Sequence, residues 1–300
     1  MDIIFATNNK FCPFSAVAIV SLLENNKEED ITIHLFTIEC EQFNVDNVTH
    51  IVERYKKKCI IHDIKDDIFQ KLPYTGIYST ACYLRLFTPS LLPNADKALY
   101  LDCDLIINGN LKELFDTNID GFAVAAVRDA TLSYNIVKDY LGFDYWKDGY
   151  FNSGVLLMNL KFWREKNLQN LLFSYLSSHR VSLPDQDALN IILHGYVLWL
   201  HPKWNCHTGY FSFPPLVVEK ERHYIKQLWT DAKIIHFTGP NKPWLAECVN
   251  PYKRMFYKYR EMTGLRYEEA HTCQTGFRNC LLIILRHCKN LVARLVSYIY

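Results

Sequence analysis

Short apolar runs alternate with amphipathic stretches through the first part of the chain. Apolar runs at residues 1–7, 31–38 and 59–64 predict strands, and the stretches at 13–26 and 44–57 predict helices. Strands that alternate with helices in this way indicate a parallel sheet with helices packed on its faces. The predicted fold class is therefore α/β.

The alternation continues along the rest of the chain. We predict further strands at 97–102, 122–127, 153–159, 196–200 and 233–238, and further helices at 78–87, 162–177, 185–193 and 252–262. A mostly parallel α/β sheet binds ligands at the carboxyl ends of its strands. The polar residues at or near those ends are the candidates for a site: residues 7–10, Asp102, Asp104, Asp129, Asn152 and His236.

Asp102 and Asp104 follow an apolar run and repel each other unless a cation offsets their charge. Alternation along a strand would turn both carboxylates to one side, where they can bind a single divalent ion. Mg²⁺ and Mn²⁺ both prefer oxygen ligands, but an imidazole such as that of His236 suits Mn²⁺ better. The alternative is a turn whose aspartates cap a helix at 111–115. The strand before the pair and the turn sequence NGNL after it favour the metal site.

The composition limits the class of protein. A chain of 300 residues with 49% hydrophobic residues can bury a large core, and its 33 basic and 32 acidic residues give no global basic surface for nucleic acid. Ten cysteines occur without a CxxC pair, and no signal peptide opens the sequence, so we expect reduced thiols in a cytoplasmic protein. No apolar run reaches the roughly 18 residues of a spanning helix.

The end of the chain, residues 277–300, carries Arg278, Arg286, Lys289 and Arg294 but no acidic residue. At about 100° per residue these cations fall on one side of a helix and apolar residues on the other. A basic amphipathic helix suits the surface of an anionic membrane, whereas a terminal helix packed on the globular body would also be amphipathic. The excess of cations favours membrane association.

Five segments occur in the order MDIIFATNN, YSTACYLRLFTPSLLPNADKALYLDCDLIINGNLKELF, FNSGVLLMNLKFWRE, LPDQDALN and HFTGPNKPW, from residue 1 to about 260. Together they resemble the retaining glycosyltransferases of family 8, which include glycogenin and bacterial lipooligosaccharide galactosyl- and glucosyltransferases. The resemblance implies a GT-A catalytic domain at 1–264, followed by the amphipathic tail at 265–300. It also implies a UDP-galactose or UDP-glucose donor, Mn²⁺ with Mg²⁺ as the alternative, and a lipooligosaccharide or lipopolysaccharide core acceptor at the inner membrane.

The resemblance also assigns roles to individual residues by their place in the motifs. Asp102, Asp104 and His236 would bind the metal. The donor contacts would be Ala6, Thr7 and Asn8 at the uracil and ribose, Arg85 and Cys103 along the donor, Asn152, Ser153, Asp185 and Gln186 at the sugar, and Gly239 and Lys242 at the diphosphate. Asp129 would face the acceptor. Bacterial members often have an acid where this chain has Asn8, and an amide can still hydrogen-bond a base or ribose.

Several of these residues also have a structural interpretation. Arg85 lies on an apolar helical face, so its partner is either the donor or a buried carboxylate. Asn152 can form a turn ahead of the strand at 153–159. Asp185 is the expected N-cap of its helix, which is compatible with a sugar contact. Lys242 follows a Gly-Pro turn, where its ammonium either neutralises a leaving UDP or lies in solvent.

Two mechanisms would retain the anomeric configuration. A double displacement needs a nucleophile on the β face of the sugar, and Gln186 stands at the family position for it, but an amide is a poor nucleophile. In a front-face substitution the leaving phosphate takes the acceptor proton, and we favour this route. Two other functions are open: a self-glucosylating enzyme like glycogenin, with an acceptor among 19 tyrosines, and a catalytically silent sugar-nucleotide-binding protein, against which the intact metal ligands argue.

Overall fold

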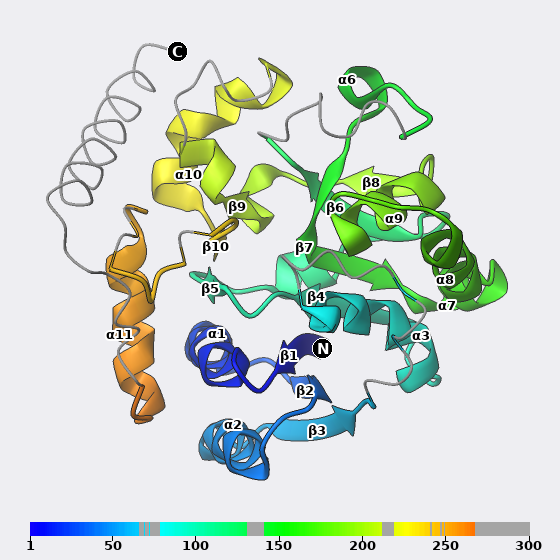
Figure 1. Cartoon of the computed structure of the whole chain (residues 1–300). Coiled ribbons are helices and arrows are strands. Elements are labelled where there is room, and N and C mark those ends of the chain that lie inside the picture. The colour runs from blue at the N-terminus through cyan, green and yellow to red at the C-terminus, as the bar shows by residue number, and fades with distance from the viewer. Residues whose placement is uncertain are drawn as a thin grey trace, which may run out of the picture.

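The computed structural model describes residues 1–65, 69, 72, 79–130, 141–211, 219–240, 242–246, 248 and 250–267 of the chain. Within these residues two β-sheets form the framework of the fold (Figure 1). The larger sheet has seven strands in the order β3-β2-β1-β4-β7-β6-β8, and the smaller has three in the order β5-β10-β9. Most neighbouring strands of the large sheet are parallel, which confirms the α/β class predicted from the sequence.

The first half of the large sheet is the predicted βαβαβ unit. β1 (Asp2–Asn8), β2 (Thr32–Ile38) and β3 (Lys58–Asp63) are parallel, and α1 (Cys12–Asn25) and α2 (Gln42–Arg54) connect them. Both helices lie on the same side of these strands and pack against each other (Figure 1). Successive residues of β1 enter two different hydrophobic clusters, so both faces of the sheet are covered.

The second half of the large sheet contains a reversed strand. β4 (Lys97–Leu101) pairs in parallel with β1, while β7 (Phe151–Asn159) runs antiparallel between β4 and β6 (Val124–Arg128). β8 (Val197–Trp199) lies at the edge, parallel to β6. Because β7 is reversed, its first residues lie at the same edge of the sheet as the carboxyl ends of β1 and β4. That edge is where an α/β sheet binds its ligands.

The small sheet is absent from the sequence-based prediction. β5 (Leu105–Ile107) directly follows the two aspartates and pairs antiparallel with β10 (Ile234–His236), with the first residue of β5 opposite the last residue of β10. β9 (Cys206–His207) pairs in parallel with the other side of β10. This pairing brings the end of β10 next to Asp104, which directly precedes β5.

The helices after β7 differ in one place from the prediction. α7 (Leu160–Glu165) and α8 (Leu168–Ser178) replace the single helix predicted at 162–177. Asn167 between them has a φ of 52°, a left-handed conformation that interrupts a helix. α9 (Pro184–Ile192) follows close to its predicted bounds and packs on β7.

The remaining described helices are short, apart from α11 (Lys253–Thr263), which packs on α1 and ends at Gly264 with a φ of 72°. The others are α3 (Thr88–Leu91), α4 (Lys112–Phe115), α6 (Tyr145–Asp148), α10 (Ile225–Asp231) and the 3-10 helices Thr80–Phe87, Pro202–Trp204, Thr208–Phe211 and Glu219–Tyr224. The basic segment 277–300 lies outside the described residues. Among the helices that are described, none combines the length and the apolar character that crossing a bilayer requires.

Truncation of Ile235 tests the packing of the small sheet. This side chain is fully buried in the middle of β10, so Ile235→Ala should leave a cavity and lower the free energy of unfolding by about 2–5 kcal/mol. The matched control is Leu171→Ala on α8, where the side chain is 48% exposed and the loss should stay below about 1 kcal/mol. Urea unfolding followed by tryptophan fluorescence measures both values. Equal losses in the two variants would contradict a tightly packed second sheet.

Candidate active site

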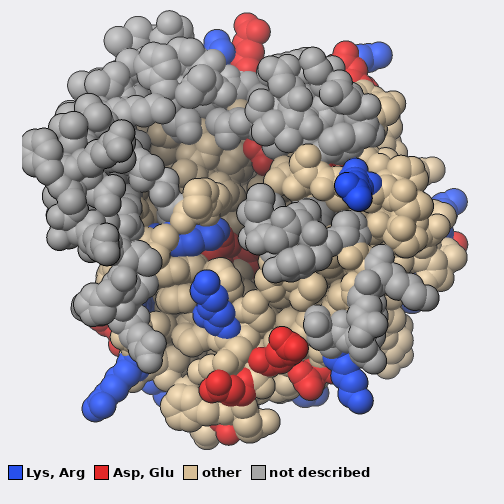
Figure 2. Space-filling view, in the orientation of Figure 1, with Lys and Arg blue, Asp and Glu red and all other residues tan. Residues whose placement is uncertain are grey.

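A pocket of about 600 Å³ opens at the edge where β1 and β4 end and β7 begins. Acidic and basic side chains adjoin one another near the middle of the face shown in Figure 2, below its outer surface. Every residue to which the family resemblance assigned a role lines this pocket: Ala6, Thr7, Asn8, Arg85, Asp102, Cys103, Asp104, Asp129, Asn152, Ser153, Asp185, Gln186, His236, Gly239 and Lys242.

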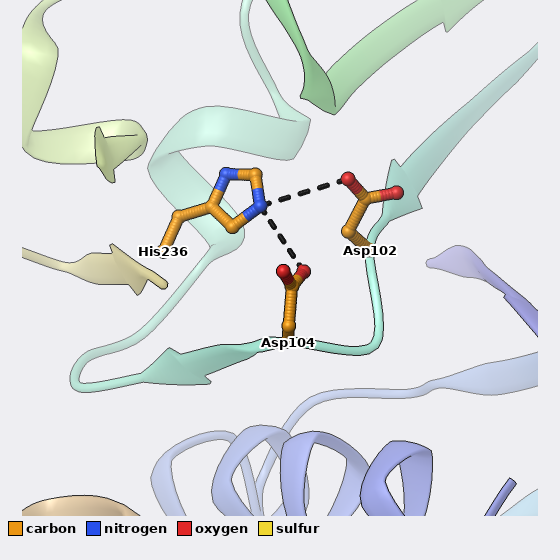
Figure 3. A group of neighbouring side chains, drawn as sticks. All are labelled: Asp102, Asp104 and His236. Carbon is orange, nitrogen blue, oxygen red and sulfur yellow. Dashed lines mark hydrogen bonds and ion pairs between the residues drawn. The ribbon is translucent and has the colours of Figure 1, made fainter. Parts of the chain in front are cut away.

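Asp102, Asp104 and His236 form the one cluster of three metal-binding side chains that the described part of the chain contains. Figure 3 shows the Nε2 atom of His236 facing both carboxylates, 3.1 Å from Asp104 Oδ1 and 3.6 Å from Asp102 Oδ2. One ligand atom from each residue lies within 4.8 Å of the other two. Two carboxylates and one imidazole are a donor set that suits a divalent ion such as Mn²⁺.

The two aspartates do not lie within one strand, as the sequence analysis assumed. They lie in the link between β4 and β5, and these strands belong to different sheets. The Asp102 N–H donates to the Gly154 oxygen at 2.9 Å, and the Phe237 N–H donates to the Asp104 oxygen at 2.9 Å. Each aspartate is therefore fixed by a different sheet, and the bend of the link brings their carboxylates together.

The alternative in which these aspartates cap the next helix is wrong. The Lys112 N–H at the start of α4 donates to Asn110 Oδ1 at 2.7 Å. The preceding N–H, that of Leu111, donates to Asn26 Oδ1 at 2.7 Å. Asparagine side chains therefore accept the N–H groups at the start of α4, and the two aspartates contact other groups.

Asp104 has a basic neighbour besides His236. The Lys242 ammonium donates to Asp104 Oδ2 and to the Phe237 oxygen, the latter at 2.9 Å. Burial opposes ionisation of Asp104, but the charges and hydrogen bonds of Lys242 and His236 outweigh it and hold the pKa of Asp104 well below its usual value. The Lys242 side chain is only 21% exposed, so it is not a solvated loop residue. Gly239, with a φ of 80°, allows the turn that leads to it.

Arg85 holds the other aspartate. Its guanidinium donates to Asp102 Oδ1 at 2.9 Å and lies 3.2 Å from Asp185 Oδ2. The Tyr100 hydroxyl donates to the same oxygen of Asp102 at 2.8 Å. Burial disfavours the charged form of Arg85, but the two carboxylates outweigh burial and raise its pKa. The carboxylate partners expected for Arg85 are therefore Asp102 and Asp185, and Arg85 also lines the pocket.

Side-chain amides connect β7 with α9 below the pocket. The oxygen of Gln186 accepts hydrogen bonds from Asn152 Nδ2 at 3.2 Å and from the Ser153 N–H at 3.0 Å. The amide nitrogen of Gln186 donates to Asp129 Oδ2 at 3.4 Å. Asn152 lies inside β7, so the interpretation that it forms a turn ahead of the strand is wrong. The amides bring the predicted sugar-side residues into one network.

The N-cap predicted for Asp185 is also wrong. The N-cap residue is Leu183, and the Asp187 carboxylate in the first turn accepts the N–H groups of Ser182 and Leu183 at 2.9 and 2.8 Å. The Asp185 carboxylate instead accepts from Ser153 Oγ at 2.9 Å and lines the pocket. Burial raises the pKa of Asp185.

The last residues of β1 line the opposite part of the pocket. Asn8 Nδ2 donates to Ser79 Oγ at 2.8 Å, and Asn8 Oδ1 accepts from the Phe11 N–H at 3.1 Å. The thiol of Cys103 donates to the Ala6 oxygen at 3.0 Å. The Asn8 amide thus shapes the loop after β1, and Cys103 ties the aspartate link to that strand.

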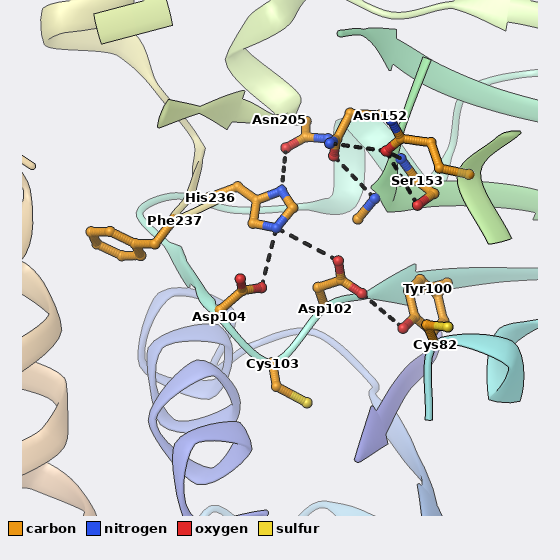
Figure 4. Close-up of polar contacts among 12 residues, drawn as sticks. Cys82, Tyr100, Asp102, Cys103, Asp104, Asn152, Ser153, Asn205, His236 and Phe237 are labelled. Atoms are coloured by element: carbon orange, nitrogen blue, oxygen red, sulfur yellow. Dashed lines mark hydrogen bonds and ion pairs between the residues drawn. The ribbon is translucent and has the colours of Figure 1, made fainter. Parts of the chain in front are cut away.

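The sequence analysis missed Asn205. This fully buried side chain lies between His236 and Asn152 in Figure 4. Asn205 Oδ1 is 3.0 Å from His236 Nδ1, and Asn205 Nδ2 donates to Asn152 Oδ1 at 2.8 Å. Its chain neighbours Trp204 and Cys206 are buried as well. A single asparagine in such a run gives no sequence signal for the partner it will meet.

Comparisons with known proteins identify the family of this chain. The model of the family Glycosyl transferase family 8 matches residues 2–248. A putative glycosyltransferase of Haemophilus influenzae is 29% identical over 257 residues, which cover 83% of this chain and 74% of the relative. The lipopolysaccharide 1,2-glucosyltransferase of Escherichia coli K12 is 27% identical over 261 residues, which cover 86% of this chain and 76% of the relative.

A solved structure shares the fold. The galactosyltransferase LgtC, in complex with donor and acceptor sugar analogues, matches with a TM-score of 0.75 at 24% sequence identity, over 90% of this chain and 98% of that one. The family match, by contrast, rests on the sequence and covers most of the chain. The chain therefore belongs to glycosyl transferase family 8, and it is a hexosyltransferase with the GT-A fold that its motifs predicted.

Proposed function

We propose that this enzyme transfers galactose or glucose from a UDP-sugar to a lipooligosaccharide or lipopolysaccharide core acceptor, with Mn²⁺ and with retention of the anomeric configuration. The observation that carries the proposal is the convergence of Asp102, Asp104 and His236 in a pocket of about 600 Å³, with Lys242 beside them. The names of two similar proteins, a lipopolysaccharide glucosyltransferase and a galactosyltransferase, support the choice of acceptor and sugar.

The side chains around the cluster fit a divalent ion. An imidazole nitrogen in the ligand set favours Mn²⁺ over Mg²⁺. Gly154 keeps the space beside the ligands open, because a Cβ added there would lie 2.1 Å from His236 Cε1 and 2.7 Å from Asp102 Oδ2. When bound by Asp102, Asp104 and His236, the ion would act as a Lewis acid toward the diphosphate.

The other pocket residues supply contacts along the donor. The Lys242 ammonium neutralises the leaving UDP as a flexible point charge, and Gly239 lets the backbone approach the diphosphate. Ala6, Thr7 and Asn8 at the end of β1 face the nucleoside, with Cys103 beside them. The sugar lies among the buried polar residues Arg85, Asn152, Ser153, Asp185 and Gln186.

The hydrogen bonds of Gln186 support the front-face mechanism. Its oxygen accepts from Asn152 Nδ2 and from the Ser153 N–H, at 3.2 and 3.0 Å. An amide oxygen engaged in this way is a poor nucleophile. In the front-face route the bond from the sugar to the phosphate breaks, the acceptor oxygen bonds to the same face, and the leaving phosphate takes the acceptor proton. Asp129, next to Gln186, faces the acceptor.

We extend the proposal to the place where the enzyme works. The cations of residues 277–300, which no acidic residue accompanies, support binding to the anionic inner leaflet. The catalytic domain would end near Gly264, which closes α11, and residues 265–300 would attach a cytoplasmic enzyme peripherally to the inner membrane. A glycolipid acceptor is presented at that surface.

Release of UDP tests the metal site and identifies the sugar. With Mn²⁺ and lipooligosaccharide acceptor we expect turnover of UDP-galactose or of UDP-glucose, and Asp104→Asn should lower it at least about 100-fold because a charged ligand is lost. The control is Asp46→Asn, which changes an exposed carboxylate on α2 and should leave turnover unchanged. Unchanged turnover in Asp104→Asn would contradict the proposed site. A folded wild type that turns over neither donor would favour the silent binding protein.

Two glycines separate metal binding from general stability. Gly154→Ala should weaken Mn²⁺ binding at least about tenfold, because the added methyl group displaces His236 and Asp102. Gly109→Ala is the matched control, since its added Cβ meets only the flexible Lys233 side chain, at 2.8 Å. Electron paramagnetic resonance of free Mn²⁺ gives both affinities. If both variants bind Mn²⁺ as the wild type does, the ion does not lie beside Gly154.

The intact mass of the wild type during turnover tests the mechanism. We expect no added hexose, because the front-face route forms no covalent intermediate and the acceptor is not the protein. A hexose that remains on the protein after the reaction would show self-glucosylation at a tyrosine. A hexose found only in rapidly quenched samples would show a double displacement and overturn the front-face route.

A further inference from the structure

We infer that Asn205 is a positioning residue for His236, and that strand β7 decides through side-chain amides which imidazole nitrogen faces the metal site. The positions of these amides follow from hydrogen bonds within the protein, whereas their consequence for catalysis rests on the proposed metal-dependent transfer. Asn205 itself lies behind the ring of His236, on the side away from the two aspartates (Figure 4).

Hydrogen bonds connect the amides of Gln186, Asn152 and Asn205 in a relay that ends at His236. Two backbone groups of β7 fix the first two amides of this relay. The Ser153 N–H donates to Gln186 Oε1 at 3.0 Å, and the Gly154 N–H donates to Asn152 Oδ1 at 3.1 Å. A backbone N–H only donates, so the atom that it meets must be an oxygen. The orientations of the Gln186 and Asn152 amides therefore follow from the strand.

The orientation then passes from one amide to the next. Because Asn152 Oδ1 is an acceptor, Asn205 must present its nitrogen to it, and these atoms are 2.8 Å apart. Asn205 Oδ1 is then the atom that lies 3.0 Å from His236 Nδ1. An oxygen in this position requires a proton on Nδ1.

The last step sets the metal-binding atom. With the proton on Nδ1, the nitrogen of His236 available to a metal ion is Nε2, and this atom faces Asp104 and Asp102 at 3.1 and 3.6 Å. Strand pairing places the backbone of His236 but does not choose between the two nitrogens of its ring. Asn205 makes that choice, as groups behind metal-binding histidines commonly do.

Within the described part of the chain, Asn205 Oδ1 is the hydrogen-bond partner of His236 Nδ1, and burial makes the choice depend on it. Asn205 is 0% exposed and His236 is 2% exposed, so water does not replace the amide when it is removed. The relay also reaches the sugar side of the pocket, because Gln186 Nε2 donates to Asp129 at 3.4 Å. A change at Asn205 is thus expected to disturb the metal ligand first and the sugar-side residues second.

Three variants of the full chain test this role. Asn205→Leu keeps the branched shape and the number of side-chain heavy atoms but removes the acceptor, and Mn²⁺ binding should weaken about 10–100-fold. Asn205→Asp keeps an acceptor for Nδ1 but places an oxygen against Asn152 Oδ1, so it should bind Mn²⁺ more weakly than the wild type and more tightly than Asn205→Leu. Asn26→Leu changes an equally buried asparagine outside the pocket, so it should lower stability and leave the Mn²⁺ affinity unchanged. Electron paramagnetic resonance gives the affinities, and urea unfolding gives the stabilities.

Nuclear magnetic resonance of the metal-free protein with ¹⁵N-labelled histidine tests the geometry itself. We expect a slowly exchanging proton on Nδ1 of His236 in the wild type and in Asn205→Asp, assigned by its loss in His236→Gln. An unprotonated Nδ1 in the wild type would overturn the inference even if Asn205→Leu fails to fold. Equal Mn²⁺ affinity of a folded Asn205→Leu and the wild type would overturn it as well.

The same measurements separate this inference from the proposed function. If the wild type carries the Nδ1 proton and binds Mn²⁺ through the three ligands but transfers no sugar, the proposed function fails and the role of Asn205 stands. If sugar transfer is normal and Asn205→Leu is as active and as tight for Mn²⁺ as the wild type, the role of Asn205 fails and the function stands.

Discussion

Two ionised carboxylates side by side repel each other, and the active site of this enzyme depends on how that repulsion is offset. Arg85 and Tyr100 bind the carboxylate of Asp102 at 2.9 and 2.8 Å. Lys242 and His236 bind the carboxylate of Asp104. These partners come from a 3-10 helix, from β4 and from the end of β10 and the loop after it. The carboxylates can therefore approach each other only when all of these elements are packed.

The division of the strands into two sheets makes this arrangement stable. β4 and β5 are adjacent in the chain but belong to different sheets, and the aspartates lie in the link between them. A slip of either strand by one residue would turn its side chains to the wrong face and expose apolar residues to water. The register of two buried sheets thus fixes both aspartates, and a flexible loop could not fix them as well.

The sequence predicted the parts of the structure that depend on local pattern. The βαβαβ unit was predicted because long apolar runs and helical spacing are visible in any single segment. In the small sheet, β10 lies within the strand predicted at 233–238, but β5 and β9 have only three and two residues, and a period cannot be recognised in so few positions. Asn167, whose left-handed conformation splits a predicted helix, gives no warning in the spacing of apolar residues.

The site was predictable to a similar degree. The acidic pair and the ordered family motifs selected a set of residues from the sequence alone, and all of these residues line the pocket. Hydrogen-bond partners were not predictable, because they depend on which side chains the folded chain brings together. Asp187 rather than Asp185 accepts the N–H groups just before α9, and Asn205 Oδ1 lies beside His236 Nδ1, although neither pairing follows from the order of residues.

The hydrogen bonds among the charged pocket residues also affect how metal and donor would bind. Lys242 donates to Asp104, and Arg85 donates to Asp102, so each charge in the site already has a partner. In the proposed function, an ion bound by Asp104 would add positive charge beside the Lys242 ammonium, and the diphosphate would supply the anion that both require. Charge without a partner is costly in a buried site. Metal and diphosphate are therefore expected to bind best together, because the diphosphate offsets the positive charge that the ion adds.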